Sequence, residues 1–250
     1  MHKKIWFCLL ICCSLNSVVT FAQVTKKGSK KNTKIAVKKP QIKKAAAINI
    51  ANLPETRVKI TTSLGDIVIR LSNKTPLHRD NFIKLVEQHF YDSLLFHRVI
   101  NNFMIQGGDP TSKNAEAGSF LGEGSNGYTI PAEFDSSLYH KKGALAAARD
   151  DNPQKASSGC QFYIVEGKKL NDEALDIAEQ NIGSKLSAAK RMTYKMNGGT
   201  PFLDSQYTVF GEVESGIEVV DKIALEPVDS NNRPLVNISM KMEVLKEAIK

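Results

Sequence analysis

Beyond Pro54, short apolar stretches recur along the chain and are separated by glycine-containing connections. Alternating or β-branched runs bounded by such turns are typical of β-strands. The expected strands are Arg57–Ser63, Ile67–Leu71, Leu94–Phe96, Val99–Gln106, Ala144–Ala148, Gln161–Val165, Thr208–Gly211 and Ile238–Val244. Many short strands with only two or three helices predict a mainly β fold, either a closed barrel or a sandwich, and not alternating βαβ units.

Two stretches have helical spacing instead. Thr75-Pro76 is typical of a helix start, with a capping side chain followed by proline in the first turn. The apolar face expected to follow consists of Leu77, Phe82, Leu85, Val86 and His89. The segment 170–200 is also helical in character, with Asn171 as its predicted cap and Gly198-Gly199 as its end. Gly183 weakens its middle, so the segment is one interrupted helix or two short ones.

The N-terminal residues have the layout of a secretory signal peptide. A basic start precedes an apolar run from Ile5 to Leu15, and Thr20-Phe21-Ala22 offers a small-residue cleavage site before Gln23. The apolar run is too short for a membrane span. We therefore predict that residues 1–22 are cleaved, with a retained anchor as the rival interpretation. The protein is then exported, first of all to the periplasm, with secretion or surface association as alternatives.

Charge is distributed unevenly along the chain. The net charge is +8 at pH 7, yet residues 1–54 hold eleven lysines and no acidic residue, and residues 55–250 carry −3. The lysines of segment 23–55 lie among small and polar residues, which predicts a flexible linker before a folded domain at 56–250. This linker suits weak contact with anionic surfaces. No aromatic residue separates its lysines, so specific nucleic-acid binding is not expected.

The most informative segment is FHRVINNFMIQGGDP at 96–110. In a regular strand Arg98 and Phe103 would face opposite sides, because side chains alternate along a strand. A local bend at Asn101-Asn102 would shift this register and bring Arg98, Phe103 and Gln106 to a common surface.

Two further segments complete a recognisable set. They are GALAAAR at 143–149 leading to SSGCQFYI at 157–164, and FLDSQYTVFGEV at 202–213. Together with the first segment they resemble the cyclophilins, whose pattern is FHR with an FM-x-QGGD run, then S-x-QFFI, then W-L-D-G-x-H-x-VFG-x-V. The resemblance extends from Arg57 to Val244 and is interrupted by the 170–200 insertion. It implies a closed eight-stranded antiparallel barrel capped by two helices, and peptidyl-prolyl cis-trans isomerase activity on proline-containing polypeptides.

The resemblance also implies roles for individual residues. Arg98 and Gln106 would be catalytic, and Gln106 with Gln161 would hydrogen-bond the substrate backbone. The implied substrate-binding residues are His97, Phe103, Met104, Ala148, Arg149, Gln161, Tyr163, Phe202, Leu203 and Tyr207. Rotation about an amide bond faces a barrier of ~18–20 kcal/mol from resonance. A guanidinium aimed at the proline nitrogen stabilises the twisted amide, so neither a metal nor a cofactor is expected.

Three positions depart from the family pattern. Phe202 stands where the family has tryptophan, Tyr207 where it has histidine, and Arg149 where many members have asparagine. Loss of the indole N–H predicts weaker binding of cyclosporin-like ligands, with the isomerase reaction retained. The 170–200 insertion leads directly into Phe202, either as an extra wall of the site, as a partner-binding surface or as a plain surface excursion.

Other interpretations of the same residues stay open. Taken alone, Arg98 would form a surface salt bridge, His97 would be a hydrogen-bonded structural histidine, and Cys160 would be a small buried strand residue. The alternative function is a proline-binding module or chaperone that does not need catalysis. A hydrolase built on His97 and Asp109 lacks a nucleophile beside them. We expect a monomer.

Overall fold

The computed structural model describes residues 54–246. The predicted signal peptide lies outside the described residues, as does the predicted linker up to residue 53. The strands are β1 (Arg57–Thr62), β2 (Gly65–Leu71), β3 (Phe96–Ile100), β4 (Met104–Gly107), β5 (Thr129–Ile130), β6 (Ala144–Ala147), β7 (Ser157–Ser158), β8 (Phe162–Val165), β9 (Val209–Ser215) and β10 (Met240–Leu245). The helices are α1 (Pro76–Glu87), α2 (Asp172–Ile182), α3 (Ala188–Met196) and α4 (Ile217–Ala224), with 3₁₀ turns η2 (Pro110–Ser112) and η3 (Pro201–Leu203).

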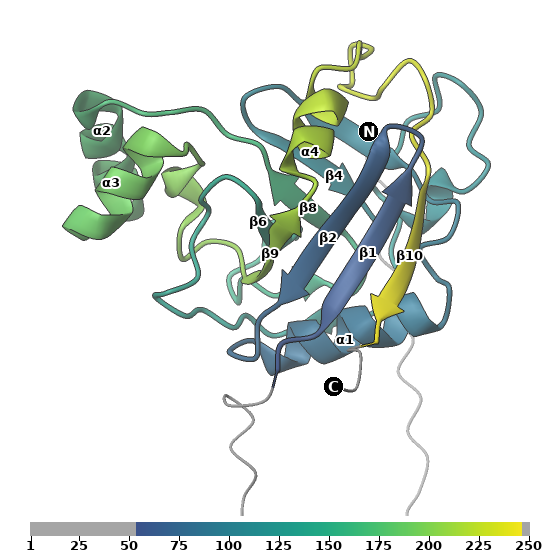
Figure 1. Cartoon of the computed structure of the whole chain (residues 1–250), viewed down its shortest axis with the longest axis horizontal. Coiled ribbons are helices and arrows are strands. Elements are labelled where there is room, and N and C mark those ends of the chain that lie inside the picture. The colour runs from purple at the N-terminus through teal and green to yellow at the C-terminus, as the bar shows by residue number, and fades with distance from the viewer. Residues whose placement is uncertain (1–53, 247–250) are drawn as a thin grey trace, which may run out of the picture. The chain divides into compact units, whose positions relative to one another are not determined.

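The predicted mainly β fold is confirmed, but its closure is not. Eight strands form one antiparallel sheet in the order β10-β1-β2-β9-β6-β8-β4-β3. The sheet curls around the principal core (Figure 1). Its edge strands β3 and β10 share no ladder, and the bridge between Leu95 and Ser239 joins them instead. The molecule therefore has an open, curled sheet where a closed barrel was expected, because the pairing stops at this seam.

The predicted hairpin at Leu64-Gly65-Asp66 is confirmed by strands β1 and β2, which pair from Arg57–Arg70 to Thr62–Gly65. Val58 and Ile60 alternate with exposed or half-buried residues and are fully buried in the core. Gly65 has φ +133°, and a side-chain carbon there would lie 2.8 Å from Val219 Cγ2 on α4. Glycine thus permits both the tight turn and the close approach of α4.

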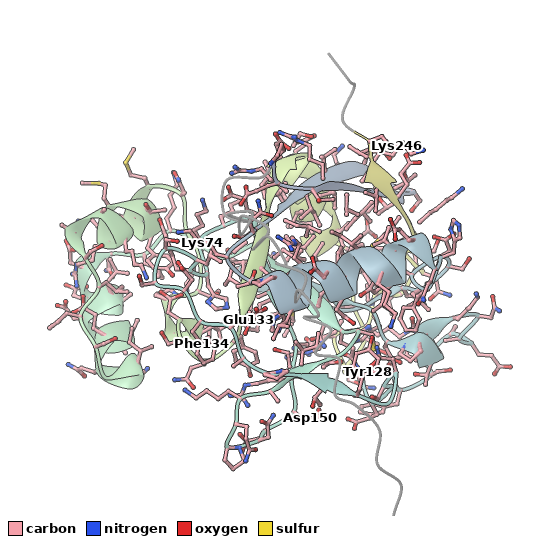
Figure 2. All side chains as sticks on the ribbon, turned by 90° about the horizontal axis from the view of Figure 1, so that it is seen from below. Lys74, Tyr128, Glu133, Phe134, Asp150 and Lys246 are labelled. Atoms are coloured by element: carbon pink, nitrogen blue, oxygen red, sulfur yellow. The ribbon has the colours of Figure 1, made fainter. Side chains whose placement is uncertain are left out.

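Helices α1 and α4 lie at opposite ends of the strands (Figure 1) and pack apolar side chains into the core. Helix α1 begins where predicted, after Thr75, but Thr75 is not the residue whose side chain caps it. The Thr75 hydroxyl makes no capping bond. The Glu133 carboxylate instead accepts hydrogen bonds from the N–H groups of Leu77 at 3.1 Å and His78 at 3.0 Å, and Figure 2 shows Glu133 at one end of α1. The expected face is confirmed for Phe82, Leu85 and Val86, which are buried. It is wrong for Leu77 and His89, which are exposed, and His78 faces the core instead.

The 170–200 insertion is two helices, α2 and α3, beside the sheet (Figure 1). The Asn171 side chain accepts from the Ala174 N–H as predicted, and Gly183 ends α2 with φ +68°. Arg191 on α3 ties the pair together, because its guanidinium bonds Asp176 and the buried Glu179 on α2 at 2.8 and 2.9 Å. In residues 54–246 no helix is long and apolar enough to cross a membrane.

Candidate active site

The candidate site is built on a row of side chains on the outer face of the sheet. The register pairs Arg98 on β3 with Gln106 on β4, and Gln106 with Tyr163 on β8. The next row, Val99, Ile105 and Ile164, points into the core and is buried. Because side chains alternate across a sheet, burying the second row obliges the first to face outward.

The chain bends where the sequence predicted it. Asn102 has φ +61°, and the Phe103 N–H bonds the Ile100 carbonyl at 3.1 Å in the turn between β3 and β4. This turn places Phe103 on the same outer face as Arg98. A second apolar cluster lies on that face and forms the floor of the site. Its buried members are Met104, Ala144, Ala146, Tyr163, Val165 and Val209, and Phe103, Ala148, Leu203 and Tyr207 pack against them.

A groove of about 500 Å³ opens over this cluster. Ten of the predicted site residues line it: His97, Arg98, Phe103, Met104, Gln106, Ala148, Arg149, Tyr163, Leu203 and Tyr207. Gln161 lines an adjoining hollow that shares Gln106, Ala148 and Arg149 with the groove. Phe202 lines neither; its ring stacks on Phe103 with centroids 5.8 Å apart and stays 46% exposed.

Arg98 is half-buried and carries its charge without a carboxylate partner among residues 54–246. Its Nη1 donates to Gln106 Oε1 at 3.1 Å. Burial lowers the pKa of Arg98, but a guanidinium stays protonated at neutral pH. The surface salt bridge considered for Arg98 is therefore not formed, and most of its N–H donors are left for a ligand in the groove.

Two glutamines extend this arrangement toward the adjoining hollow. Gln106 Nε2 donates to Gln161 Oε1 at 3.0 Å. Gln161 Nε2 in turn donates to the carbonyls of Gly122 and Gly124, both at 2.8 Å. Arg98 thus begins a chain of side-chain bonds that holds both amide groups in fixed orientations.

His97 is buried, and neither ring nitrogen makes a hydrogen bond of normal geometry. The prediction that His97 is a hydrogen-bonded structural histidine is therefore wrong. Burial lowers the pKa of His97 to about 4, so the ring is neutral at pH 7. Nearby, burial opposes ionisation of Asp109, but hydrogen bonds from Thr111 and Gly122 outweigh it and hold the pKa of Asp109 below its usual range. Asp109 thereby fixes the loop that forms one rim of the groove.

Comparisons with known proteins identify the family to which this geometry belongs. A family model described as cyclophilin type peptidyl-prolyl cis-trans isomerase/CLD matches residues 57–244. The chain belongs to this family. A relative from Staphylococcus haemolyticus, named for the same activity, is 32% identical over 200 residues, which cover 80% of this chain and 93% of the relative. The chain is a cofactor-free peptidyl-prolyl cis-trans isomerase of the cyclophilin type.

Other relatives differ in length or are more distant. A bifunctional phosphatase/peptidyl-prolyl cis-trans isomerase from Streptococcus pyogenes is 34% identical over 190 residues, and the matched part spans only 38% of that protein. A cyclophilin crystal structure from Cryptosporidium parvum has a TM-score of 0.58 at 24% identity, covering 78% of this chain and 99% of its own, which shows the shared fold. A second structure of that protein was determined in the presence of the dipeptide Ala-Pro.

Two of the three positions that depart from the cyclophilin pattern, Arg149 and Tyr207, are in direct contact in the groove wall. The Arg149 guanidinium carbon lies 4.7 Å from the centroid of the Tyr207 ring, a cation–π contact. Arg149 Nε also donates to the Gln206 carbonyl at 3.0 Å. The Tyr207 ring meets Tyr163 edge-on at 5.9 Å. Arg149 and Tyr207 therefore replace the usual pair as one packed unit.

Part of the groove lies on segments that the sequence did not point to. The loop residues Phe120–Glu123 and Ser230–Asn232 complete its lining. The Val99 N–H bonds the Asn232 carbonyl at 2.8 Å, which fixes the second loop to β3. Neither loop has a periodic pattern, and both reach the groove only through long-range contacts. The first loop is connected to the recognised motif through Asp109, whose buried carboxylate accepts a hydrogen bond from the Gly122 N–H. A buried carboxylate requires such donors.

Proposed function

We propose that the groove beside Arg98 binds an X–Pro segment and that Arg98 accelerates rotation about its peptide bond. The support is a half-buried guanidinium that has no carboxylate partner among the described residues and lies over an apolar floor. The apolar floor suits a proline ring, and Met104 and Phe103 offer it soft and aromatic surfaces. The Ala-Pro dipeptide structure of the Cryptosporidium protein supports the same class of ligand.

The chemistry follows from how an amide rotates. The twisted amide has lost its resonance, so its nitrogen becomes pyramidal and carries a free lone pair. Arg98 stabilises that nitrogen more than the planar one, which lowers the barrier without a covalent step. Gln106 and Gln161 hold donors and acceptors in fixed orientations, so one side of the bond stays anchored while the other turns.

Exchange of an X–Pro peptide, followed by NMR, tests this function. Arg98→Ala removes the charge and leaves the apolar floor, so we expect kcat/KM to fall roughly hundredfold, the scale of losing one transition-state donor. Arg70→Ala is the matched control, because Arg70 also lies on the sheet but is paired with Glu55 and Glu212 outside the groove. Equal rates for wild type and Arg98→Ala overturn the proposal.

A proline-binding module without required turnover is the second candidate. It is favoured by the aromatic wall of Tyr163 and Tyr207, which needs no charge to hold a proline ring. Binding and exchange separate the two functions. If Arg98→Ala binds the peptide as wild type does and also complements a deletion strain, binding alone is the function.

We propose further that the substrates are exported proteins. The support is the predicted signal peptide at 1–22 and the lysine-rich segment that follows it. N-terminal sequencing of the protein from fractionated cells tests this. A mature chain that begins at Gln23 in the periplasm is expected, whereas a cytoplasmic protein that retains its leader contradicts the proposal.

A further inference from the structure

A buried chain of hydrogen bonds leads from the helical insertion to the floor of the groove. The Tyr194 hydroxyl on α3 donates to Asp204 Oδ2 at 2.8 Å. Asp204 Oδ1 receives the His140 backbone N–H at 2.9 Å and lies 3.0 Å from His140 Nδ1. His140 Nε2 lies 3.0 Å from the Tyr163 hydroxyl. All four side chains are buried.

The acceptors decide where each proton lies. Asp204 accepts on both oxygens, so His140 Nδ1 carries a hydrogen and donates it. The other ring nitrogen, Nε2, shares a hydrogen bond with the Tyr163 hydroxyl. Burial raises the pKa values of Tyr163 and Tyr194, which keeps both phenols protonated. The polar tip of Tyr163 is thereby pulled toward His140, and its ring stacks on the imidazole at 6.1 Å.

The insertion is anchored at the same place. It leaves the chain after β8 and returns directly before η3, which carries Leu203 of the groove wall. A side-chain carbon on Gly167 would lie 2.6 Å from Gly199 Cα, so the two ends of the insertion touch. A side-chain carbon on Gly199 would likewise lie 2.6 Å from the Tyr194 ring. Helix α2 packs on η3 itself.

We propose that the α2–α3 insertion sets the shape of the proline groove through Tyr194, Asp204 and His140, which makes Tyr194 a positioning residue for the isomerase reaction. The proposal rests on the proposed function of the groove. Tyr163 and Leu203 both line the groove, and Leu203 packs against the apolar cluster that contains Tyr163. The Asp204 carboxylate holds both residues in place. It fixes Leu203 because Asp204 is the next residue in the chain, and it fixes Tyr163 through the hydrogen bonds of His140.

Loosening this part of the groove is expected to weaken binding of the peptide and not to slow the rotation itself. The wall contacts the proline ring in the planar and twisted amide alike, so loosening it raises KM and leaves kcat unchanged. The full-length protein is tested as Tyr194→Phe, which keeps the ring against Gly199 and deletes only the hydroxyl. We expect KM, and the Kd of a proline-containing peptide from NMR titration, to rise about three- to tenfold, the scale of one buried hydrogen bond.

Tyr139→Phe is the matched control. Its ring packs edge-on against Tyr194 at 5.6 Å, and its hydroxyl bonds Thr193 at 3.2 Å, outside the chain to the groove. We expect unchanged KM, kcat and Kd for this variant. Equal effects of the two substitutions overturn the proposal, as does a Tyr194→Phe variant that loses kcat at constant KM.

Asp204 offers a rescue test that a general structural role would not pass. Asp204→Ala breaks the chain, whereas Asp204→Asn keeps an oxygen acceptor toward His140 and offers an amide donor toward the Tyr194 hydroxyl. We expect Asp204→Asn to restore most of the affinity that Asp204→Ala loses, and equal losses overturn the proposal. If wild type binds peptide but does not turn it over, only the proposed function fails and the Kd values still decide this proposal. If wild type does not bind, both fail.

Discussion

His97 illustrates how one residue can couple stability to pH in this molecule. Burial lowers the pKa of His97 to about 4, below the usual value of 6.5. Between these two values the unfolded chain binds the proton more readily than the folded one, so stability falls as the pH falls. We predict a loss of about 3 kcal/mol of unfolding free energy between about pH 6.5 and 4 from this residue, and no further loss below.

Urea unfolding at a series of pH values measures this effect. His97→Leu removes the titrating ring, so its stability should fall less over the same interval. His89→Leu is the control, because the His89 side chain is 73% exposed and has no comparable burial cost. A wild-type stability curve that is as flat as that of His97→Leu contradicts the prediction.

At the scale of elements, helix α1 depends on a residue far away in the sequence. Glu133 accepts the N–H groups of Leu77 and His78 and lies 2.7 Å from His78 Nδ1. A carboxylate at a helix start satisfies free donors and opposes the positive end of the helix dipole. We predict that Glu133→Ala costs about 2 kcal/mol of unfolding free energy, measured in urea. Glu87→Ala, at the exposed far end of the same helix, should be neutral; equal costs contradict the prediction.

Features that depend on neighbouring residues could be predicted from the sequence, whereas features that depend on distant residues could not. Asn171 caps α2 through an N–H three residues away, and Gly183 ends that helix by its own φ, so local chemistry sufficed. Arg98 and Gln106 were predicted from the resemblance to the cyclophilins, and the bend expected at Asn101-Asn102 agrees with their pairing on one face of the sheet. Glu133 and α1, in contrast, are more than fifty residues apart in the chain. Tertiary contacts of that kind leave no periodic pattern, and the loop at Ser230–Asn232 reaches the groove through such a contact, between Val99 and Asn232. The Tyr194–Asp204 contact spans only ten residues, but it has no periodic pattern either.

At the scale of the whole molecule, the sheet separates two apolar clusters with different tasks. The inner cluster contains the side chains of both capping helices, whereas the outer one floors the groove. The inner face therefore carries the larger buried core, and the outer face carries the groove in which we propose that the reaction takes place. The seam between β3 and β10 is where the inner core could open, because the ladder stops there.

Backbone hydrogen bonds nevertheless cross that seam. The Ser93 N–H bonds the Met240 carbonyl, the Met240 N–H bonds the Leu94 carbonyl, and the Phe96 N–H bonds the Ile238 carbonyl, each at 2.9 Å. Met240 and Phe96 are buried in the inner core, so opening the seam exposes core side chains. We predict that the seam opens only on global unfolding, as the most protected amides of a domain do.

Native-state hydrogen exchange followed by NMR decides this. The amides of Phe96 and Met240 should exchange as slowly as those of β1, which is paired on both sides by β2 and β10. The Gly127 amide, bonded only to the exposed Ser125 side chain, serves as the fast reference. Exchange at Phe96 and Met240 that is much faster than in β1 and insensitive to global stability would show that the seam opens by itself. The hydrogen bonds across the seam would then break during motions that leave β1 intact.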